Sequence, residues 1–269
     1  GNGGLWTALT VILVAHVVSV TTGLSISSIA TDKKVGAGGP YYIVSRSLGL
    51  PIGGTLGLAL FVGLSFSISL YVIGFCESFL AFWGVEPTVD NIRIYGTGTI
   101  IVLTVVTLIS TSFAIKTQYV ILGLIGLSLV FVGLSPGAAP EQIHLTRAEG
   151  GASFFEIFAI FFPAVTGFTA GVNMSGDLRD PKRSIPVGTL AAISVGLVVY
   201  VSLAIYLAWR VPVEDLLENP NVLAARSSIP LAVFFGIWGA TLSSGLGSIL
   251  GAPRILQAMS SDRVTPTFF

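Results

Sequence analysis

The sequence predicts an all-α integral membrane protein, on the evidence of its composition, its long apolar stretches and one marked interruption. Of the 269 residues, 53% are hydrophobic and 10% are charged, whereas a soluble domain carries roughly 25% charged residues. Several apolar stretches are long enough to cross a bilayer as helices. One of them carries a proline and two glycines near its centre. The composition excludes an ordinary soluble domain.

Charge and cysteine content exclude several functions. The 13 basic and 13 acidic residues cancel, and we find no basic tract that would attract nucleic acid. The single cysteine, Cys76, lies in an apolar run and cannot form an internal disulfide. We find no catalytic triad, paired carboxylates or phosphate loop. We therefore expect neither an enzyme nor a bound cofactor.

Seven stretches have the length of a membrane span, which is about 20 apolar residues. Two of them, the third and the fourth, are separated only by Lys116, Thr117 and Gln118. Their joint length is about twice what a bilayer accommodates, so we predict a tight turn at these three residues. The seven stretches are Leu5–Ala30, Gly53–Phe82, Ile94–Ile115, Thr117–Leu134, Phe154–Ser175, Ile185–Trp209 and Ile229–Met259.

The basic residues predict the orientation in the membrane. They are more frequent in the connections after the first, third, fifth and seventh stretches, and basic residues close to spans stay on the cytoplasmic side. The first span is therefore expected to begin outside the cell membrane and to run inward. Because no cleavable signal precedes Leu5, we expect an upstream helix and interpret the chain as a fragment.

The fifth stretch predicts a broken helix. It reads FFPAVTGFTAG from Phe161 to Gly171. Pro163 removes one helical hydrogen bond, and Gly167 allows the backbone to unwind. Carbonyl groups at the end of the first half-helix can hold a cation, and amides at the start of the second can face an anion. The alternative is an ordinary proline kink, and the local sequence does not decide between the two.

Polar residues inside two other stretches are further candidates. The hydroxyls of Ser243 and Ser244 can bind a hard cation, but serines also pack and hydrogen-bond between membrane helices. Tyr71 lies near the centre of its stretch, where a lone tyrosine is usually part of the core. Glu77, about two turns further on, is an ionisable residue at membrane depth and therefore a functional hypothesis.

Three motifs resemble the cation-chloride cotransporters, a family within the amino acid, polyamine and organocation superfamily. They read VGAGGPYYIVSRSLG from Val35 to Gly49, FFPAVTGFTAGVNMSGDLRDPKRSIPVGT from Phe161 to Thr189, and ATLSSGLGSILGAPRILQA from Ala240 to Ala258. Weaker similarity extends over nearly all of the chain. The short connection from Arg210 to Ser228 is similar to that of prokaryotic members.

The resemblance implies a fold of ten core helices in two inverted five-helix repeats. The seven stretches then correspond to helices two to eight, so residues 5–265 form a transporter domain that is incomplete at both ends. Helices one, nine and ten are expected elsewhere in the same protein. Helix one supplies backbone ligands for the ions in this family. The resemblance leaves a homodimer open.

The resemblance also implies three ion sites and a gate. Phe168 and Thr169 differ from the aliphatic residues usual at their positions, which affects the pocket shape more than amide donation. The implied residues are Tyr71, the Pro163 carbonyl and the Thr166 hydroxyl for potassium; the amides of Gly167, Phe168 and Thr169 for chloride; Ala240, Ser243 and Ser244 for sodium; and Glu77 for the outer vestibule or gate.

The expected function is symport of sodium and/or potassium with chloride by alternating access. The ions are substrates rather than cofactors, and the lipid bilayer is the other expected partner. One alternative is an amino-acid or amine permease of the same superfamily, because the broken helix can equally receive a substrate carboxylate. Another is a membrane subunit that does not transport.

Overall fold

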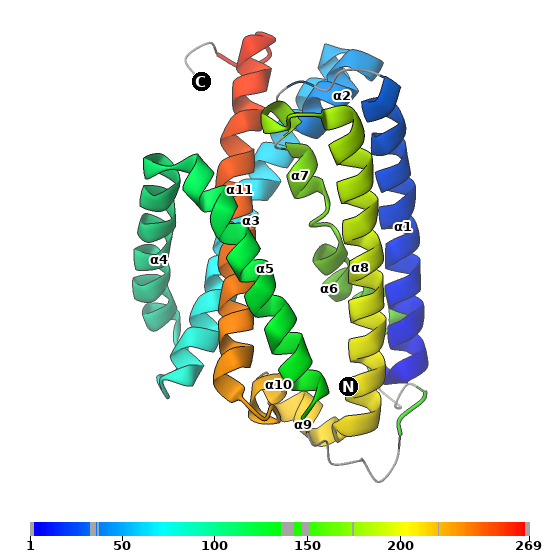
Figure 1. Cartoon of the computed structure of the whole chain (residues 1–269), viewed down its shortest axis with the longest axis vertical. Helices are drawn as coiled ribbons and strands as arrows, with labels where there is room; N and C mark the ends of the chain where they lie inside the picture. Colours follow the sequence, from blue (N-terminus) through cyan, green and yellow to red (C-terminus); the bar gives the residue numbers. More distant parts are fainter. Residues whose placement is uncertain are drawn as a thin grey trace. The chain divides into compact units, whose positions relative to one another are not determined.

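A computed structural model describes residues 3–32, 36, 38–135, 143–146, 151–173, 175–219 and 221–266, and this part of the chain is helical without β-strands (Figure 1). Two 3-10 helices, η1 and η2, accompany the α-helices. The elements are α1 (Gly4–Asp32), α2 (Gly39–Leu48), α3 (Leu50–Phe82), α4 (Val89–Ile109), α5 (Thr111–Gly133), α6 (Phe154–Phe161), η1 (Phe162–Val165), α7 (Thr169–Asn173), η2 (Ser175–Asp177), α8 (Pro181–Arg210), α9 (Val213–Glu218), α10 (Val222–Ala225) and α11 (Pro230–Ser261).

Six helices are long and apolar enough to cross a membrane: α1, α3, α4, α5, α8 and α11. Large apolar side chains on their outer faces are exposed, as Leu108 in α4 is at 80%. Such surfaces are stable against lipid rather than water. The prediction of a multi-pass, all-α membrane protein is confirmed. Of the motif from Val35 to Gly49, residues 35 and 37 lie outside the described part.

The predicted turn at Lys116, Thr117 and Gln118 is wrong, because all three residues lie inside α5. The chain turns instead at Ser110, which has an extended backbone with φ −159° and ψ 102°. The Ser110 side chain accepts a hydrogen bond from the Phe113 amide at 3.1 Å and so caps the start of α5. Ser110 alone separates α4 from α5. Lys116, Thr117 and Gln118 therefore lie several residues inside the second helix.

The predicted break in the fifth stretch is confirmed. The helix α6 begins at a capping box, in which the Ser153 side chain accepts from the Glu156 amide at 3.3 Å. It ends at Phe161, and the chain passes through η1 and the three residues from Thr166 to Phe168 before α7 begins at Thr169. Pro163 lies in the first turn of η1, where its missing N–H group is tolerated.

Contacts divide the chain into two compact units. The first unit contains α1 and the helices from α6 to α9. Its longest helices, α1 and α8, run side by side and antiparallel (Figure 1). Gly23 permits this approach, because a Cβ there would come within 2.8 Å of Ile193 Cδ1 and 3.2 Å of Thr189 Cγ2. Small residues allow such close helix packing in membranes.

The second unit contains α2 to α5 and α11, with α3 and α11 antiparallel at its centre (Figure 1). A Cβ on Gly57 would lie 2.7 Å from both Met259 Sδ and Tyr41 Cδ2. Tyr41, Ile255 and Met259 form a buried cluster there. Close glycine contacts therefore hold both α2 and α11 against α3.

A polar cluster fixes α2 to the end of α11. The Asp262 carboxylate accepts from the Tyr41 hydroxyl at 2.8 Å and from Arg46 Nη2 at 2.7 Å. The Arg46 guanidinium lies over the Tyr42 ring, 5.1 Å from its centroid. Burial, followed by the hydrogen bond to Asp262, raises the pKa of Tyr41 to about 12.

Candidate functional site

The backbone carbonyls at the break are the first candidate ligands. The Pro163 carbonyl oxygen accepts from the Thr166 hydroxyl at 2.8 Å and from the Thr166 amide at 3.3 Å. The two predicted potassium ligands of this segment, the Pro163 carbonyl and the Thr166 hydroxyl, are thus neighbours. Both residues are exposed. Both groups are oxygen ligands of the kind that hard cations prefer, and in this structure they are hydrogen-bonded to each other.

Two further carbonyls of the break are bonded from the flanking helices. The Ser19 hydroxyl of α1 donates to the Val165 carbonyl at 3.1 Å. The Tyr200 hydroxyl of α8 donates to the Ala164 carbonyl at 3.0 Å. Both bonds satisfy groups that would otherwise be unpaired in lipid. The unwound segment is therefore held on two sides.

The amides that follow the break are the candidate anion donors. Thr169 N donates to the Thr166 carbonyl at 3.4 Å, and Ala170 N donates to the Gly167 carbonyl at 3.1 Å. Within the described ranges, no backbone acceptor is found for the amides of Gly167 and Phe168. Two of the three amides that the resemblance implies for chloride are therefore available to a ligand, and the third is weakly bonded.

The predicted sodium ligands lie together in α11. The Ser244 hydroxyl donates to the Ala240 carbonyl at 2.9 Å, one turn earlier. The Ser243 hydroxyl donates to Gln118 Oε1 of α5. Tyr71 of α3 is close to the same stretch, because its Cβ lies 3.9 Å from the position that a Cβ on Gly245 would occupy.

The structure thus gathers the candidates in two groups. The residues from Pro163 to Thr169 belong to the first unit, whereas Tyr71, Ala240, Ser243 and Ser244 belong to the second. The potassium set that the resemblance implies draws on both units. None of these side chains carries a formal charge. Among the described residues, no group of three or more His, Cys, Asp or Glu could hold a metal ion.

Glu77 is exposed on α3, the helix that also carries several aromatic residues. Phe75 and Phe79, which flank it in sequence, contact the Trp238 ring of α11 at centroid distances of 6.4 and 5.4 Å. Phe82 and Phe234 extend this aromatic cluster. Residues two positions apart lie on different faces of a helix, so sequence proximity does not join Glu77 to this cluster.

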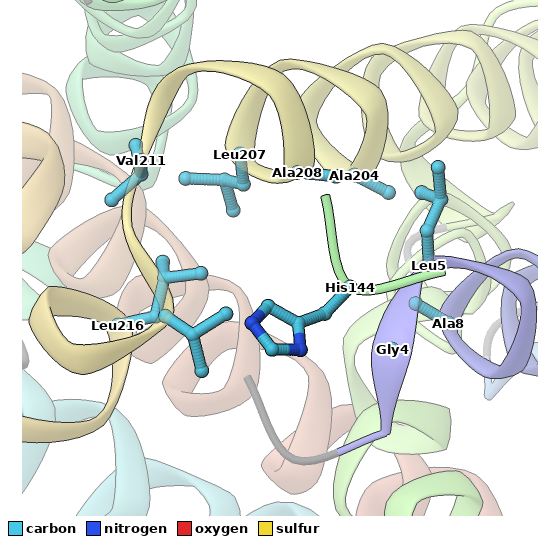
Figure 2. A pocket seen from close by; sticks show the side chains of 10 residues that line it. Gly4, Leu5, Ala8, His144, Ala204, Leu207, Ala208, Val211 and Leu216 are labelled. Carbon is cyan, nitrogen blue, oxygen red and sulfur yellow. The ribbon is translucent and has the colours of Figure 1, made fainter. Parts of the chain in front are cut away.

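An apolar pocket of about 190 Å³ lies in the first unit, separate from the break. It is lined by the start of α1 and the end of α8, and the His144 ring projects into it toward Leu216 (Figure 2). The Leu5 and Trp6 amides donate to the carbonyls of His144 and Leu145, each at 3.0 Å. The segment 143–146 therefore satisfies the first amides of α1.

A family model described as amino acid permease matches residues 1–269. The chain belongs to the amino acid permease family. The curated proteins that it resembles are named as solute carriers and cotransporters, and none of these names is that of an enzyme. This confirms the resemblance to the family and the expectation that the chain is not an enzyme, whereas the similarity to prokaryotic members stays a prediction.

Three relatives of this permease-family chain illustrate the similarity. Solute carrier family 12 member 2 of Mus musculus is 32% identical, and the match covers 100% of this chain and 27% of the relative. Solute carrier family 12 member 1 of Mus musculus is 33% identical, over 98% of this chain and 30% of the relative. The bumetanide-sensitive sodium-(potassium)-chloride cotransporter of Manduca sexta is 31% identical, over 98% and 31%. The chain spans less than a third of each relative.

Three polar residues of this permease-family chain were missed in the sequence: Ser19, Gln118 and Tyr200. Each lies inside a helix long enough to cross a membrane, and polar side chains there usually have a partner. That signal was present in the sequence. Their partners were not, because each one bonds a residue more than 30 positions away.

Proposed function

We propose that the protein is a secondary symporter that couples sodium and/or potassium with chloride across the membrane. The observation that carries the proposal is the break between α6 and α7, where the paired oxygens of Pro163 and Thr166 adjoin the available amides of Gly167 and Phe168. Peptide dipoles of both signs at one break suit a cation and an anion bound together. The name of one relative, the sodium-(potassium)-chloride cotransporter of Manduca sexta, supports these ions as substrates.

In the proposed mechanism, dipoles replace the hydration shells of the ions. Each bound ion lowers the cost of placing the opposite charge nearby in a low dielectric, which couples their transport. Potassium is assigned to Tyr71, Pro163 and Thr166, chloride to the amides of residues 167–169, and sodium to Ala240, Ser243 and Ser244. Glu77 is proposed to act at the outer vestibule.

Alternating access is proposed to move the two compact units rather than the two sequence repeats. The first unit joins α1 to α6–α9, and the second joins α2–α5 to α11, so each unit takes helices from both halves of the chain. A compact unit moves as one body more readily than a repeat whose helices are divided between two units. The proposed location is the cell membrane, with the start of α1 outside.

Ion uptake in the full-length protein tests the function. Rubidium and chloride entry that require each other and sodium would support the symporter. Sodium-driven uptake of amino acids, without chloride dependence, would instead establish an amino-acid permease. Absence of any uptake from a folded, correctly inserted protein would favour the non-transporting subunit.

Substitution tests the sodium assignment separately. Replacing Ser243 and Ser244 together by alanine removes both hydroxyl ligands, and we expect rubidium uptake to lose its sodium dependence. Ser248, one turn further along α11, is buried and gives a matched Ser248→Ala control. Unchanged sodium kinetics in the double variant would remove the assignment.

A further inference from the structure

Gln118 lies on the face of α5 that packs against α11. The two helices approach closely along one line, where a Cβ on Gly239 would come within 3.1 Å of Ile121 Cγ2 and Gly236 faces Ser128. Gln118 continues this line almost one turn before Ile121 and reaches Ser243. A polar side chain within a membrane-length helix is thus directed at one hydroxyl of α11.

Gln118 bonds Ser243 at two points. Its Oε1 accepts the proton of the Ser243 hydroxyl, and its Nε2 donates to the Ser243 carbonyl oxygen at 3.4 Å. The neighbouring hydroxyl, Ser244, instead donates to the Ala240 carbonyl of its own helix. The two adjacent serines therefore direct their protons in different directions, one to α5 and one along α11.

This arrangement has a chemical consequence for a cation at the serines. A hydroxyl that ligates a cation uses an oxygen lone pair, and its single proton must point to an acceptor elsewhere. Without such an acceptor the hydroxyl can rotate and turn its positive end toward the cation. Gln118 supplies the acceptor for Ser243, and the second bond to the Ser243 carbonyl fixes which end of the amide faces the hydroxyl.

We propose that Gln118 is a positioning residue of the sodium site. It accepts the hydrogen bond of the Ser243 hydroxyl and so directs that O–H group toward α5, which leaves the lone pairs of the hydroxyl oxygen facing the cation. The inference rests on the proposed sodium site of Ala240, Ser243 and Ser244. A neutral amide performs this task without placing a second charge beside the ion. Partners outside the ligand shell orient metal ligands in this way, and their loss typically weakens binding by about 10- to 100-fold.

Two readouts on the purified full-length protein test the role. The first is the shift of the thermal unfolding midpoint when sodium chloride replaces N-methylglucamine chloride, which reports sodium binding without transport. The second is the sodium concentration that gives half-maximal rubidium uptake. Gln118→Met keeps the side-chain length but removes the acceptor, Gln118→Leu provides a second apolar variant, and Gln118→Glu retains an acceptor. Thr117→Val is the matched control, because the Thr117 hydroxyl donates to the Phe113 carbonyl of α5 itself at 3.0 Å.

We expect Gln118→Met and Gln118→Leu to raise the half-maximal sodium concentration by about 10- to 100-fold, with the rate at saturating sodium nearly unchanged. Gln118→Glu keeps an acceptor and adds a negative charge that attracts a cation, so its half-maximal sodium concentration should not rise above that of the wild type. Thr117→Val should match the wild type. The sodium-dependent unfolding shift should follow the same order.

Two results would overturn the role of Gln118 while leaving the sodium site intact. One is an unchanged half-maximal concentration in both apolar variants, and the other is an equal loss in Gln118→Glu, which would indicate packing rather than proton acceptance. A wild-type protein whose unfolding midpoint does not respond to sodium would overturn the site itself, and with it the role of Gln118. The sodium response of the wild-type protein therefore tests the site, and the comparison of the Gln118 variants tests the role of Gln118.

Discussion

At the scale of single residues, the break is defined as much by its neighbours as by its own proline. Pro163 explains why helical bonding stops, but it does not explain where the freed carbonyls point. Ser19 and Tyr200 do so, because they bond the carbonyls of Val165 and Ala164. The carbonyl of Pro163 is bonded within the break itself by Thr166. All three carbonyls are therefore bonded in this structure, two from the flanking helices and one from within the break.

Removing the Tyr200 hydroxyl should loosen this segment. Tyr200→Phe deletes the bond to the Ala164 carbonyl and leaves that carbonyl with one partner fewer, at a cost of about 1 kcal/mol. We expect a roughly fivefold weaker apparent affinity for rubidium, measured as the half-maximal concentration in uptake, because about 1 kcal/mol corresponds to that factor.

Tyr206→Phe, on the same helix, is the control and should leave the affinity unchanged. Amide hydrogen exchange of residues 164–170 provides a readout that does not depend on the transported ion. Faster exchange there in Tyr200→Phe alone is expected. Equal exchange in both variants would contradict the bracing role.

At the scale of helices, the sequence predicted the spans and the break but not the short elements. Apolar length identifies α1, α3, α8 and α11, because the bilayer thickness demands it. The turn was placed at Lys116 because polar residues are expected outside lipid. Gln118 is tolerated in α5 because it finds a partner in α11, and such a tertiary bond is invisible in the local sequence. Thr117 bonds the Phe113 carbonyl of its own helix.

The helix α2 was missed for a related reason. Its motif contributed to the family resemblance, but its ten residues are too short for a span. Its position depends on Tyr41 and Arg46 meeting Asp262, more than 200 residues later. Neither α9 nor α10 was predicted, since helices of four to six residues lie below what periodicity can resolve.

The docking of α2 should depend on Asp262. Asp262→Ala leaves the buried Tyr41 hydroxyl without this acceptor, which costs about 1–3 kcal/mol. We expect a lower thermal unfolding midpoint in detergent. Asp90→Ala is the control, because Asp90 and Arg93 form a pair at 3.6 Å whose side chains are 88% and 76% exposed. Exposed pairs contribute at most about 1 kcal/mol, so equal destabilisation by the two variants would contradict the prediction.

Closing the break should impair transport without harming the fold. Pro163→Ala restores the missing N–H group and favours a continuous helix through residues that now form η1. We expect rubidium and chloride uptake to fall at least tenfold while the unfolding midpoint is kept or raised. Pro186→Ala is the control, since Pro186 lies inside α8, which remains one helix. Normal uptake in Pro163→Ala would show that the break is not needed.

At the scale of the whole molecule, two compact units interleave the two halves of the sequence. The helices α1 and α8 pair in one unit, and α3 and α11 pair in the other. By the family resemblance, α1 and α8 correspond to helices two and seven, and α3 and α11 correspond to helices three and eight. The two members of each pair occupy equivalent positions in the two repeats. Pairing of equivalent helices was not predicted, because it follows from long-range contacts rather than from the pattern of any one segment.

A cation and chloride bound together at the break should stabilise the molecule more than additively. A ligand at 100 times its dissociation constant stabilises the folded state by about 2.7 kcal/mol. Cation and chloride placed near each other in a low dielectric should each tighten the binding of the other. Potassium chloride should therefore raise the unfolding midpoint by more than the sum of two separate shifts, one measured in potassium gluconate and one in N-methylglucamine chloride.

The measurement is a thermal unfolding matrix at constant ionic strength, with N-methylglucamine gluconate as the reference. Pro163→Ala is the matched variant, because a continuous helix should lose both ions and their coupling together. Strictly additive shifts in the wild type would mean that the ions bind independently, and the coupling of a symporter would then have to arise without contact between its substrates. If chloride leaves the unfolding midpoint unchanged and an added amino acid raises it, the result would favour the amino-acid permease.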